Sequence, residues 1–272
     1  MSVLEAFDLS IRFGGVQANL DVSIAVDEYE IVGVIGPNGA GKTTLFNMIT
    51  GFYRPDSGRI VYRGRDITGL PVHERAALGL GRTFQNVGLV KGATVRENLV
   101  TAQYLQAGYG VVGGMLGSRG SLASERTLGS RAGLLAEALG LADLLDEQVA
   151  GLPYGTLKRI EIATALATDP DVLLLDEPSS GMGPEEAHQL GDDLLDLRRR
   201  FGISIVMIEH HVPLVMRVCD YVYCLDFGQL LTHGLPDAVR NHPQVVAAYL
   251  GEDPDPLVVE LDHQLDALVE TD

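Results

Sequence analysis

The sequence predicts an α/β fold with a mostly parallel sheet, an N-terminal antiparallel β-subdomain and an inserted helical subdomain. Three observations predict it. A glycine-rich loop at residues 36–44 lies between the apolar run Ile31–Ile35 and a helical pattern that begins at Leu45. Two further aliphatic runs, Val172–Leu175 and Ile203–Ile208, each follow a helical segment, as strands of βαβ units do. A long helical stretch separates the loop from these two strands.

The remaining elements can be placed in chain order. Residues 1–30 alternate apolar and polar positions around a Gly14-Gly15 turn, which predicts the antiparallel sheet. Arg59–Tyr62 is expected to form a further strand. The helical subdomain is expected at about residues 86–165. Its clearest helix is predicted over Arg131–Leu145, with one apolar face formed by Leu134, Leu135, Ala138, Leu141 and Leu145.

Composition and charge limit the function. With 272 residues and 46% hydrophobic content, the chain can bury a large core, which its lack of Trp makes mostly aliphatic. A formal net charge of −17 argues against binding to nucleic acid or to anionic lipid, since both need clustered Lys and Arg. Residues 252–272 form an acidic extension with eight Asp or Glu and no Lys or Arg. The leucines of this extension have helical spacing, which predicts an amphipathic helix. Such a helix could pack on its own domain, or it could serve regulation or oligomerisation.

The compartment is inferred from three features. Cys219 and Cys224 flank a strand-like run and are expected to be core residues in a reducing environment. The chain has no charged-then-apolar leader at its start. The uncharged run Asn98–Ser118 is long enough to span a bilayer, but its five glycines favour a glycine-rich insertion. We therefore expect a soluble, cytoplasmic protein without a transmembrane segment.

The glycine-rich loop predicts a nucleotide site. It fits the pattern G-x-x-x-x-G-K-[ST], in which glycines let backbone N–H groups turn towards an anion and the next helix points its positive end at the same place. Lys42 supplies a charge for the β- and γ-phosphates, and Thr43 a hydroxyl for Mg²⁺. We expect a nucleoside triphosphate to bind here, against Gly36, Pro37, Asn38, Gly39, Ala40, Gly41, Lys42, Thr43 and Thr44.

Two acidic residues follow the strand Val172–Leu175. The carboxyl end of a buried parallel strand faces the crevice in which open α/β sheets bind ligands. Asp176 is placed to hold Mg²⁺, and Glu177 is the candidate that orients and polarises the attacking water. His210, after Ile203–Ile208, is expected at the same edge, where its imidazole could contact the γ-phosphate. Gln85 could ligate Mg²⁺ or contact the water.

Taken in order, these residues resemble the ATPase subunit of ATP-binding cassette (ABC) transporters, whose core is a P-loop NTPase fold. The resemblance covers residues 1–251 as one ATPase domain. It joins the Walker A loop at Gly36–Thr44, the Q-loop glutamine Gln85, the Walker B strand Val172–Asp176 with Glu177, and the switch histidine His210. The segments Gly81–Asn86, Thr94–Leu99 and Leu152–Gly155 are similar to the larger ATPase of branched-chain amino-acid importers.

The resemblance implies a partner ATPase, and the sequence departs from the family's usual residues at two positions. In this family two ATPases sandwich two nucleotides head to tail, and each phosphate loop meets the partner's signature motif. Here Leu152–Thr156 matches that motif, so Tyr154, Gly155 and Thr156 are expected to contact ATP, and Pro153 replaces the usual serine. Gly183 replaces the usual Asp of the D-loop. Phe13 matches the aromatic position that stacks on adenine, although a plain core Phe would also fit.

These expectations lead to one function and two alternatives. The resemblance implies an ATP-hydrolysing subunit, with ATP and Mg²⁺ as cofactors, that energises an importer for branched-chain or related amino acids. It would lie peripherally on the cytoplasmic face of the cell membrane, bound to permease subunits and to a second ABC ATPase, either a paralogue or itself. An ATPase of a lipid or lipopolysaccharide exporter shares the same motifs. A soluble cassette protein of DNA repair or translation is the other alternative.

Overall fold

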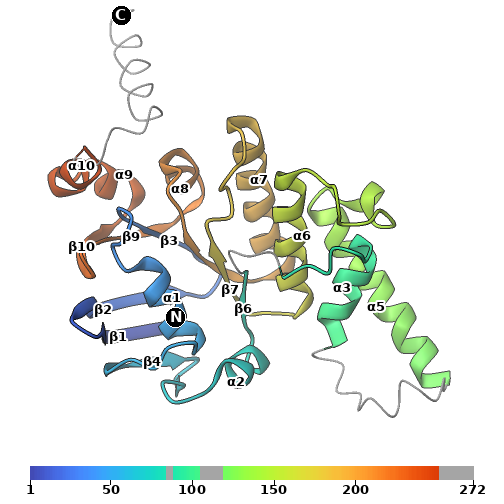
Figure 1. Ribbon diagram of the computed structural model, residues 1–272, viewed down its shortest axis with the longest axis horizontal. Coiled ribbons are helices and arrows are strands. Elements are labelled where there is room, and N and C mark those ends of the chain that lie inside the picture. Colours follow the sequence, from blue (N-terminus) through green and yellow to red (C-terminus); the bar gives the residue numbers. More distant parts are fainter. Residues whose placement is uncertain (84–87, 105–118, 251–272) are drawn as a thin grey trace, which may run out of the picture.

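We describe a computed structural model of the chain, which covers residues 1–83, 88–104 and 119–250. Figure 1 shows its strands in the left and central parts and the helices α3 (Val95–Tyr104) and α5 (Arg119–Ala138) on the right. The expected glutamine Gln85, the glycine-rich run after Tyr104 and the acidic extension lie outside the described residues.

A six-stranded sheet forms the centre of the molecule. Its strand order is β10 (Gln229–Gly234), β9 (Tyr221–Asp226), β3 (Ile31–Ile35), β8 (Ser204–Ile208), β7 (Val172–Asp176) and β6 (Leu80–Arg82). All neighbouring pairs are parallel except β9 and β10. Every residue of β3, β7 and β8 is buried, which explains their unbroken aliphatic sequences. The α/β prediction is confirmed.

A second, antiparallel sheet contains β2 (Val16–Asp27), β1 (Ser2–Phe13), β4 (Ser57–Tyr62) and β5 (Arg65–Asp66), in that order. The helix α1 (Lys42–Thr50) contributes Leu45, Phe46, Met48 and Ile49 to the core cluster that also holds apolar residues of both sheets. The N-terminal antiparallel sheet was thus predicted correctly. Its packing fixes the helix that follows the glycine-rich loop.

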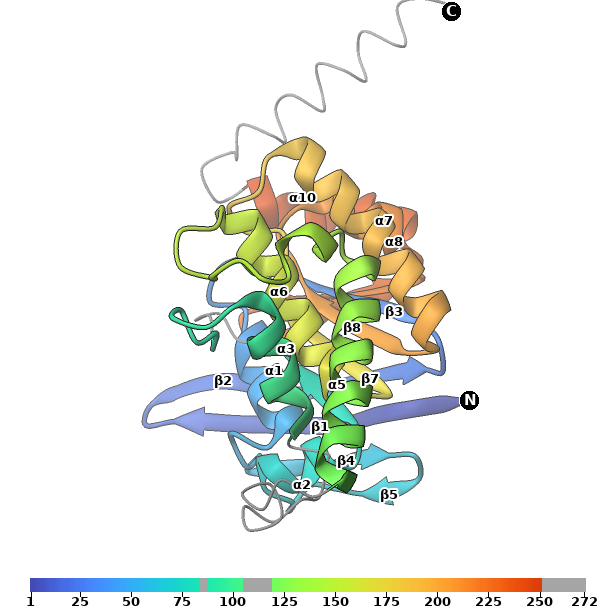
Figure 2. The same cartoon turned by 90° about the vertical axis from the view of Figure 1, so that its right-hand side faces the viewer.

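Helices cover the other face of the six-stranded sheet. They are α6 (Tyr154–Ala167), α7 (Pro184–Phe201), α8 (Val212–Val218), α9 (Pro236–Arg240) and α10 (Pro243–Leu250). Together with α3 and α5 they share a continuous apolar core with β3, β7 and β8. Figure 2 shows α3, α5 and α6 side by side, and the contacts between these three helices agree with that view. The short elements α2 (Val72–Ala77) and η1 (Ala142–Leu144) lie in connections.

Two sequence expectations need correction. The helix predicted over Arg131–Leu145 ends at Ala138, because Gly140 adopts a left-handed conformation with φ 65°. Leu134, expected on the apolar face, is 62% exposed. The first residues of the uncharged run from Asn98 belong to α3 and bury Leu99 and Ala102 in the core, in the stretch where helical segments were expected. The apolar spacing continues past Gly140, so the predicted helix extended beyond the glycine that ends it.

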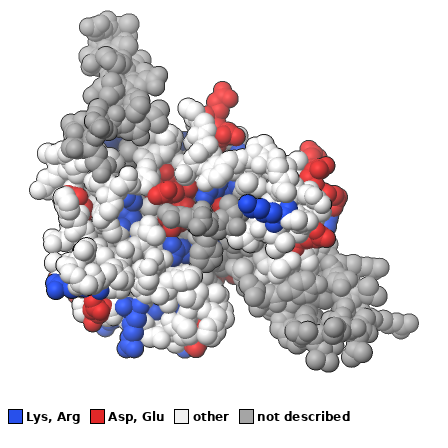
Figure 3. All heavy atoms as spheres, viewed as in Figure 1, with Lys and Arg blue, Asp and Glu red and all other residues white. Residues whose placement is uncertain are grey.

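The surface and the cysteines complete the fold. No helix within the described ranges is long and apolar enough to cross a membrane. On the face in Figure 3, Lys and Arg appear as separate small groups among Asp and Glu. Cys219 and Cys224 are buried and unpaired by disulfide, and burial raises the pKa of the Cys224 thiol to about 12. Both therefore act as small core residues.

Candidate active site

The glycine-rich loop connects β3 to α1 through backbone conformations that favour glycine. Gly36 has φ 144° and Gly41 has φ 93°. A Cβ at Gly36 would lie 2.1 Å from the carbonyl oxygen of Leu225, and one at Gly41 would lie 2.5 Å from that of Ala18. No side chain fits at either position. The chain on both sides of the loop is therefore pressed against β9 and β2.

Lys42 lies inside this loop. It is the first residue of α1, it is 6% exposed, and its Nζ donates to the carbonyl oxygens of Gly36 at 2.6 Å and Pro37 at 2.8 Å. Asn38 and Gly39 are exposed at the tip of the loop. The N-terminus of α1 carries a partial positive charge beside the buried ammonium group. A phosphate in the loop would thus meet two concentrated sources of positive charge.

Asp176 ends β7 in a buried position. It is 1% exposed, and its Oδ2 accepts from the guanidinium of Arg82 at 2.9 Å. Burial raises the pKa of the Asp176 carboxyl, and Arg82 opposes the rise. Its Oδ1 is buried without a hydrogen-bond partner. A buried carboxylate oxygen with no donor is available to a cation or to a water that a cation holds.

This oxygen provides a fit test for Mg²⁺. Thr43 lies in the first turn of α1, as the metal-binding hydroxyl of a phosphate loop does. Within the described ranges no group of three His, Cys, Asp or Glu could hold a metal ion. One or two protein oxygens are enough for Mg²⁺, which completes its shell with phosphate and water, so the fit test rests on Thr43 and Asp176. The residues present fit a nucleotide-bound Mg²⁺.

Glu177 and His210 are brought together at the carboxyl ends of β7 and β8. His210 Nε2 lies 2.8 Å from Glu177 Oε1, and both side chains are partly exposed. Glu177 has φ 50°, a left-handed conformation that is uncommon outside glycine, Asn and Asp, and its N–H donates to the carbonyl of Ile208. This backbone conformation accompanies the orientation of the Glu177 carboxylate towards His210.

Sequence reasoning gave no role to Glu209, yet it organises this edge of the sheet. It is 2% exposed, and its carboxylate accepts from the backbone N–H of Ser179 at 2.7 Å, His210 at 3.0 Å and His211 at 3.2 Å. One side chain thereby fixes both the segment after β7 and the segment after β8. The sequence signal that could have identified Glu209 is its position directly after a buried aliphatic strand.

Arg82 was also missed as a site residue. It stands on β6 and, besides Asp176, donates to Asn47 Oδ1 at 2.7 Å and Thr50 Oγ1 at 3.1 Å of α1. Its guanidinium lies 5.7 Å from the centre of the Phe46 ring. Arg82 therefore connects the acidic end of β7 with the helix of the phosphate loop. Its side chain is 8% exposed.

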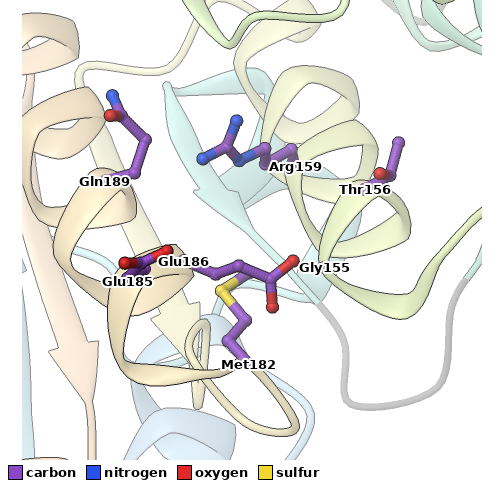
Figure 4. Close-up of a pocket in the computed structure, with 7 residues that line it drawn as sticks. All are labelled: Gly155, Thr156, Arg159, Met182, Glu185, Glu186 and Gln189. Carbon is purple, nitrogen blue, oxygen red and sulfur yellow. The ribbon is translucent and has the colours of Figure 1, made fainter.

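The signature-like segment packs against a neighbouring loop. Pro153 is the N-cap of α6, and the exposed ring of Tyr154 lies against Gly181, where a Cβ would be 2.8 Å from the ring. A Cβ at Gly155 would lie 3.0 Å from Glu186 Oε1. Figure 4 shows the adjacent pocket of about 300 Å³, lined by Gly155, Thr156, Arg159, Met182, Glu185, Glu186 and Gln189.

Those contacts join the start of α6 to Gly181 in the loop before α7 and to Glu186 in the first turn of α7. Nζ of Lys158, one turn along α6, lies 5.7 Å from the centre of the Tyr154 ring. Phe13 lies elsewhere again, at the end of β1, where its 44% exposed ring meets the Tyr53 ring edge at 5.1 Å between centroids. An exposed aromatic face of this kind can stack on a planar ring.

Comparisons with known proteins address the whole chain. A family described as ABC transporter matches residues 20–180, and one described as branched-chain amino acid ATP-binding cassette transporter matches residues 229–255. A high-affinity branched-chain amino acid transport ATP-binding protein, LivG of Salmonella typhimurium, is 42% identical over 90% of this chain and 96% of its own length. The lipopolysaccharide export system ATP-binding protein LptB of Haemophilus influenzae is 36% identical over 93% of this chain and 98% of its own.

Solved structures give the same fold. The structure of the ADP conformation of an ATP-binding cassette from an ABC transporter superposes with a TM-score of 0.81 and 33% sequence identity. The match covers 93% of this chain and 100% of the other. It extends over both sheets and the helices that cover them, so the similarity is not confined to the phosphate loop.

Proposed function

The chain belongs to the ABC transporter ATPases with a branched-chain amino acid transporter C-terminal segment, and we propose that it hydrolyses ATP to drive import of branched-chain or related amino acids. The observation that carries the catalytic part is the pair Glu177–His210, 2.8 Å apart, at the sheet edge where the phosphate loop also lies. Parallel β3, β7 and β8 all end at this edge.

In the proposed reaction Glu177 orients the attacking water and accepts its proton. His210 contacts the γ-phosphate next to that water. Lys42 leaves the carbonyl oxygens of Gly36 and Pro37 to pair with the phosphates. Backbone N–H groups from residue 38 to residue 44 surround the phosphate oxygens. Thr43, Asp176 and Gln85 would hold Mg²⁺, which neutralises phosphate charge when it is bound.

A second ATPase would complete each nucleotide site. Support comes from the match of Leu152–Thr156 to the signature motif of the family and from the exposed position of Tyr154 at the start of α6. In a head-to-tail pair, Tyr154, Gly155 and Thr156 would approach the partner's nucleotide with the N-terminus of α6. Pro153 and Gly183 stand where the family commonly has serine and aspartate, so this half-site would offer backbone groups in place of a hydroxyl.

Permease subunits would bind at the helical subdomain expected at about residues 86–165. A cavity of about 360 Å³ opens there between the core strand β6 and the helices α3 and α6, with Arg82, Leu89, Ala102 and Glu161 among its lining residues. A concave, mainly apolar surface between two parts of a chain suits a docked protein segment. The protein would then be held peripherally at the cytoplasmic side of the membrane.

The exporter alternative is less well supported. LptB is 36% identical, whereas LivG reaches 42%, and the branched-chain transporter family matches the C-terminal segment. The net charge of −17 also disfavours a nucleic-acid role.

The catalytic proposal is tested by Glu177→Gln in the full chain. The variant should bind ATP with wild-type affinity but hydrolyse it at least a hundredfold more slowly, because the amide cannot take a proton. Phosphate release and nucleotide binding are measured side by side, with exposed Glu28→Gln as the control. Turnover near the wild-type value would refute the role of Glu177.

The transport proposal is tested by co-purification. Tagged protein drawn from native membranes should bring permease subunits and a second ABC ATPase, identified by mass spectrometry. Recovery of only soluble partners from intact membranes would favour a cassette ATPase outside transport. Recovery of components of an envelope-lipid exporter would favour the LptB-like alternative.

A further inference from the structure

The last described helix returns to the phosphate loop. The backbone N–H of Gly36 donates to the hydroxyl of Tyr249 at 2.8 Å, across a separation of 213 residues. Tyr249 belongs to α10, inside the segment that the C-terminal family match covers. The contact therefore reaches the first residue of the nucleotide-binding loop from the opposite end of the described chain.

Gly36 is the point at which β3 gives way to the loop. Its φ of 144° turns the chain, and the carbonyl of Leu225 occupies the space that a side chain would need. The two polar backbone groups of this residue have different partners. Its N–H is held by Tyr249, and its C=O accepts from Lys42 Nζ at 2.6 Å. The tyrosine thus fixes one side of the residue that the lysine holds on the other.

The Tyr249 ring is anchored well enough to do this. It is partly buried and packs against the apolar core that lies under α6, α7 and α8. One turn earlier on the same helix Val245 is 4% exposed, and Val239 of the preceding α9 is 1% exposed. Because the ring is held by packing, its hydroxyl can act as a fixed acceptor for the loop.

We propose that Tyr249 is a positioning residue of the nucleotide site. Its hydroxyl keeps the Gly36 peptide turned so that the following N–H groups converge on the phosphates and Lys42 can transfer to them. This inference rests on the proposed ATP-binding function. It assigns the C-terminal segment a part in ATP affinity, through a residue that touches the loop backbone and not the reacting atoms.

The test compares Tyr249→Phe with wild type in the full chain. The ring and its packing remain, so the change is confined to the hydroxyl that accepts from Gly36. Dissociation constants for MgATP are measured by calorimetry, and steady-state ATPase rates give KM and kcat. We expect the dissociation constant and KM to rise about two- to tenfold, the effect of one neutral hydrogen bond, while kcat stays within about twofold. The melting temperature should fall by no more than about 6 °C, the effect of losing one hydrogen bond.

Tyr221→Phe is the matched control. Its hydroxyl contacts His233 Nδ1 at 2.7 Å, and Tyr221 pairs with Val32, at the end of the sheet away from Gly36. It should leave KM unchanged. The proposal is overturned if Tyr249→Phe binds MgATP like wild type, or if both variants weaken binding equally. Absence of MgATP binding by the wild-type chain would instead remove the proposed function.

Discussion

At the residue scale, the acidic edge of the sheet depends on how each carboxylate is held. Glu177 is partly exposed on a left-handed backbone, whereas Glu209 is buried and accepts from three backbone N–H groups. Hydrogen bonds to an ionised carboxylate are stronger than those between neutral groups. Glu209 therefore sets the backbone position of His210, and His210 meets Glu177.

Replacing Glu209 by Gln should disturb His210 without touching Glu177. The amide has one acceptor oxygen in place of two, so at least one of the three backbone donors loses its partner. We expect ATP turnover to fall about tenfold and unfolding free energy to drop by about 1–3 kcal/mol. Phosphate release and urea unfolding measure the two effects. Unchanged turnover would show that His210 does not depend on this carboxylate.

Glu161 on α6 predicts a pH dependence of stability. Both carboxylate oxygens are buried without a hydrogen-bond partner, although Lys158 Nζ lies 3.3 Å away, and burial raises the pKa of this carboxyl above 4.5. A folded-state pKa above the unfolded value contributes stability below pH 4.5 that is lost as pH rises through the folded pKa. Glu161→Gln removes this dependence.

The stability of Glu161→Gln should therefore improve relative to wild type as pH rises from 4.5 towards 8. Urea unfolding of both proteins at several pH values measures the difference. Parallel stability curves would mean that the carboxyl has the same pKa in both states. Exposed Glu28→Gln is again the control, since it should leave the curves parallel.

At the element scale, α1 is fixed at both of its ends. Gly41 starts the helix against β2, and Arg75 of α2 holds its C-terminus. The guanidinium of Arg75 donates to the carbonyl oxygens of Met48, Ile49, Leu70 and Thr68. Arg75 is 1% exposed, and burial lowers its pKa to about 10, so it remains charged at neutral pH. The phosphate-loop helix thus has a charged C-cap supplied by another helix.

Arg75→Lys keeps the charge but loses the planar array of donors. An ammonium has three donors for four carbonyl oxygens and cannot reach them in one plane. We expect a loss of about 1–3 kcal/mol in unfolding free energy. Chemical denaturation measures it, with exposed Arg65→Lys as the control. Equal stability of the two variants would mean that these bonds contribute little beyond the charge.

At the scale of the whole molecule, the phosphate loop joins two apolar cores. One core lies between the two sheets around α1, and the other lies between the six-stranded sheet and the helices. The loop follows β3, whose residues alternate between the two cores. A ligand in the loop therefore contacts the segment that connects β3 to α1. Binding to the folded state alone should stabilise the entire chain.

MgATP at a hundred times its dissociation constant should add about 2.7 kcal/mol of stability. For a domain of this size that corresponds to a rise of about 5–10 °C in melting temperature. Thermal unfolding with and without MgATP measures the shift. Lys42→Ala should abolish most of it because the buried ammonium group is lost. A shift of equal size in that variant would place the nucleotide elsewhere.

The fold class, the buried strands around the phosphate loop and the family could all be read from local sequence, whereas the edge strands β6 and β10 could not. Periodicity and the loop motif are local signals, and they survive without knowledge of any distant contact. The helix end at Gly140 was missed for the same reason, since apolar spacing continued beyond it. The catalytic and nucleotide-contacting roles given to Glu177, His210, Tyr154 and Gln85 stay predictions.

The residues that support the site became visible only through contacts between distant parts of the chain. Arg82 meets Asp176 across 94 residues, Arg75 caps α1 across 26 to 27, and Tyr249 reaches Gly36 across 213. The supporting contacts of Arg82, Arg75 and Tyr249 could not be read from spacing, because a guanidinium or a phenol hydroxyl can hold a carboxylate or a backbone group from many sequence positions. Their effect depends on direction and burial, which packing sets and spacing along the chain does not encode.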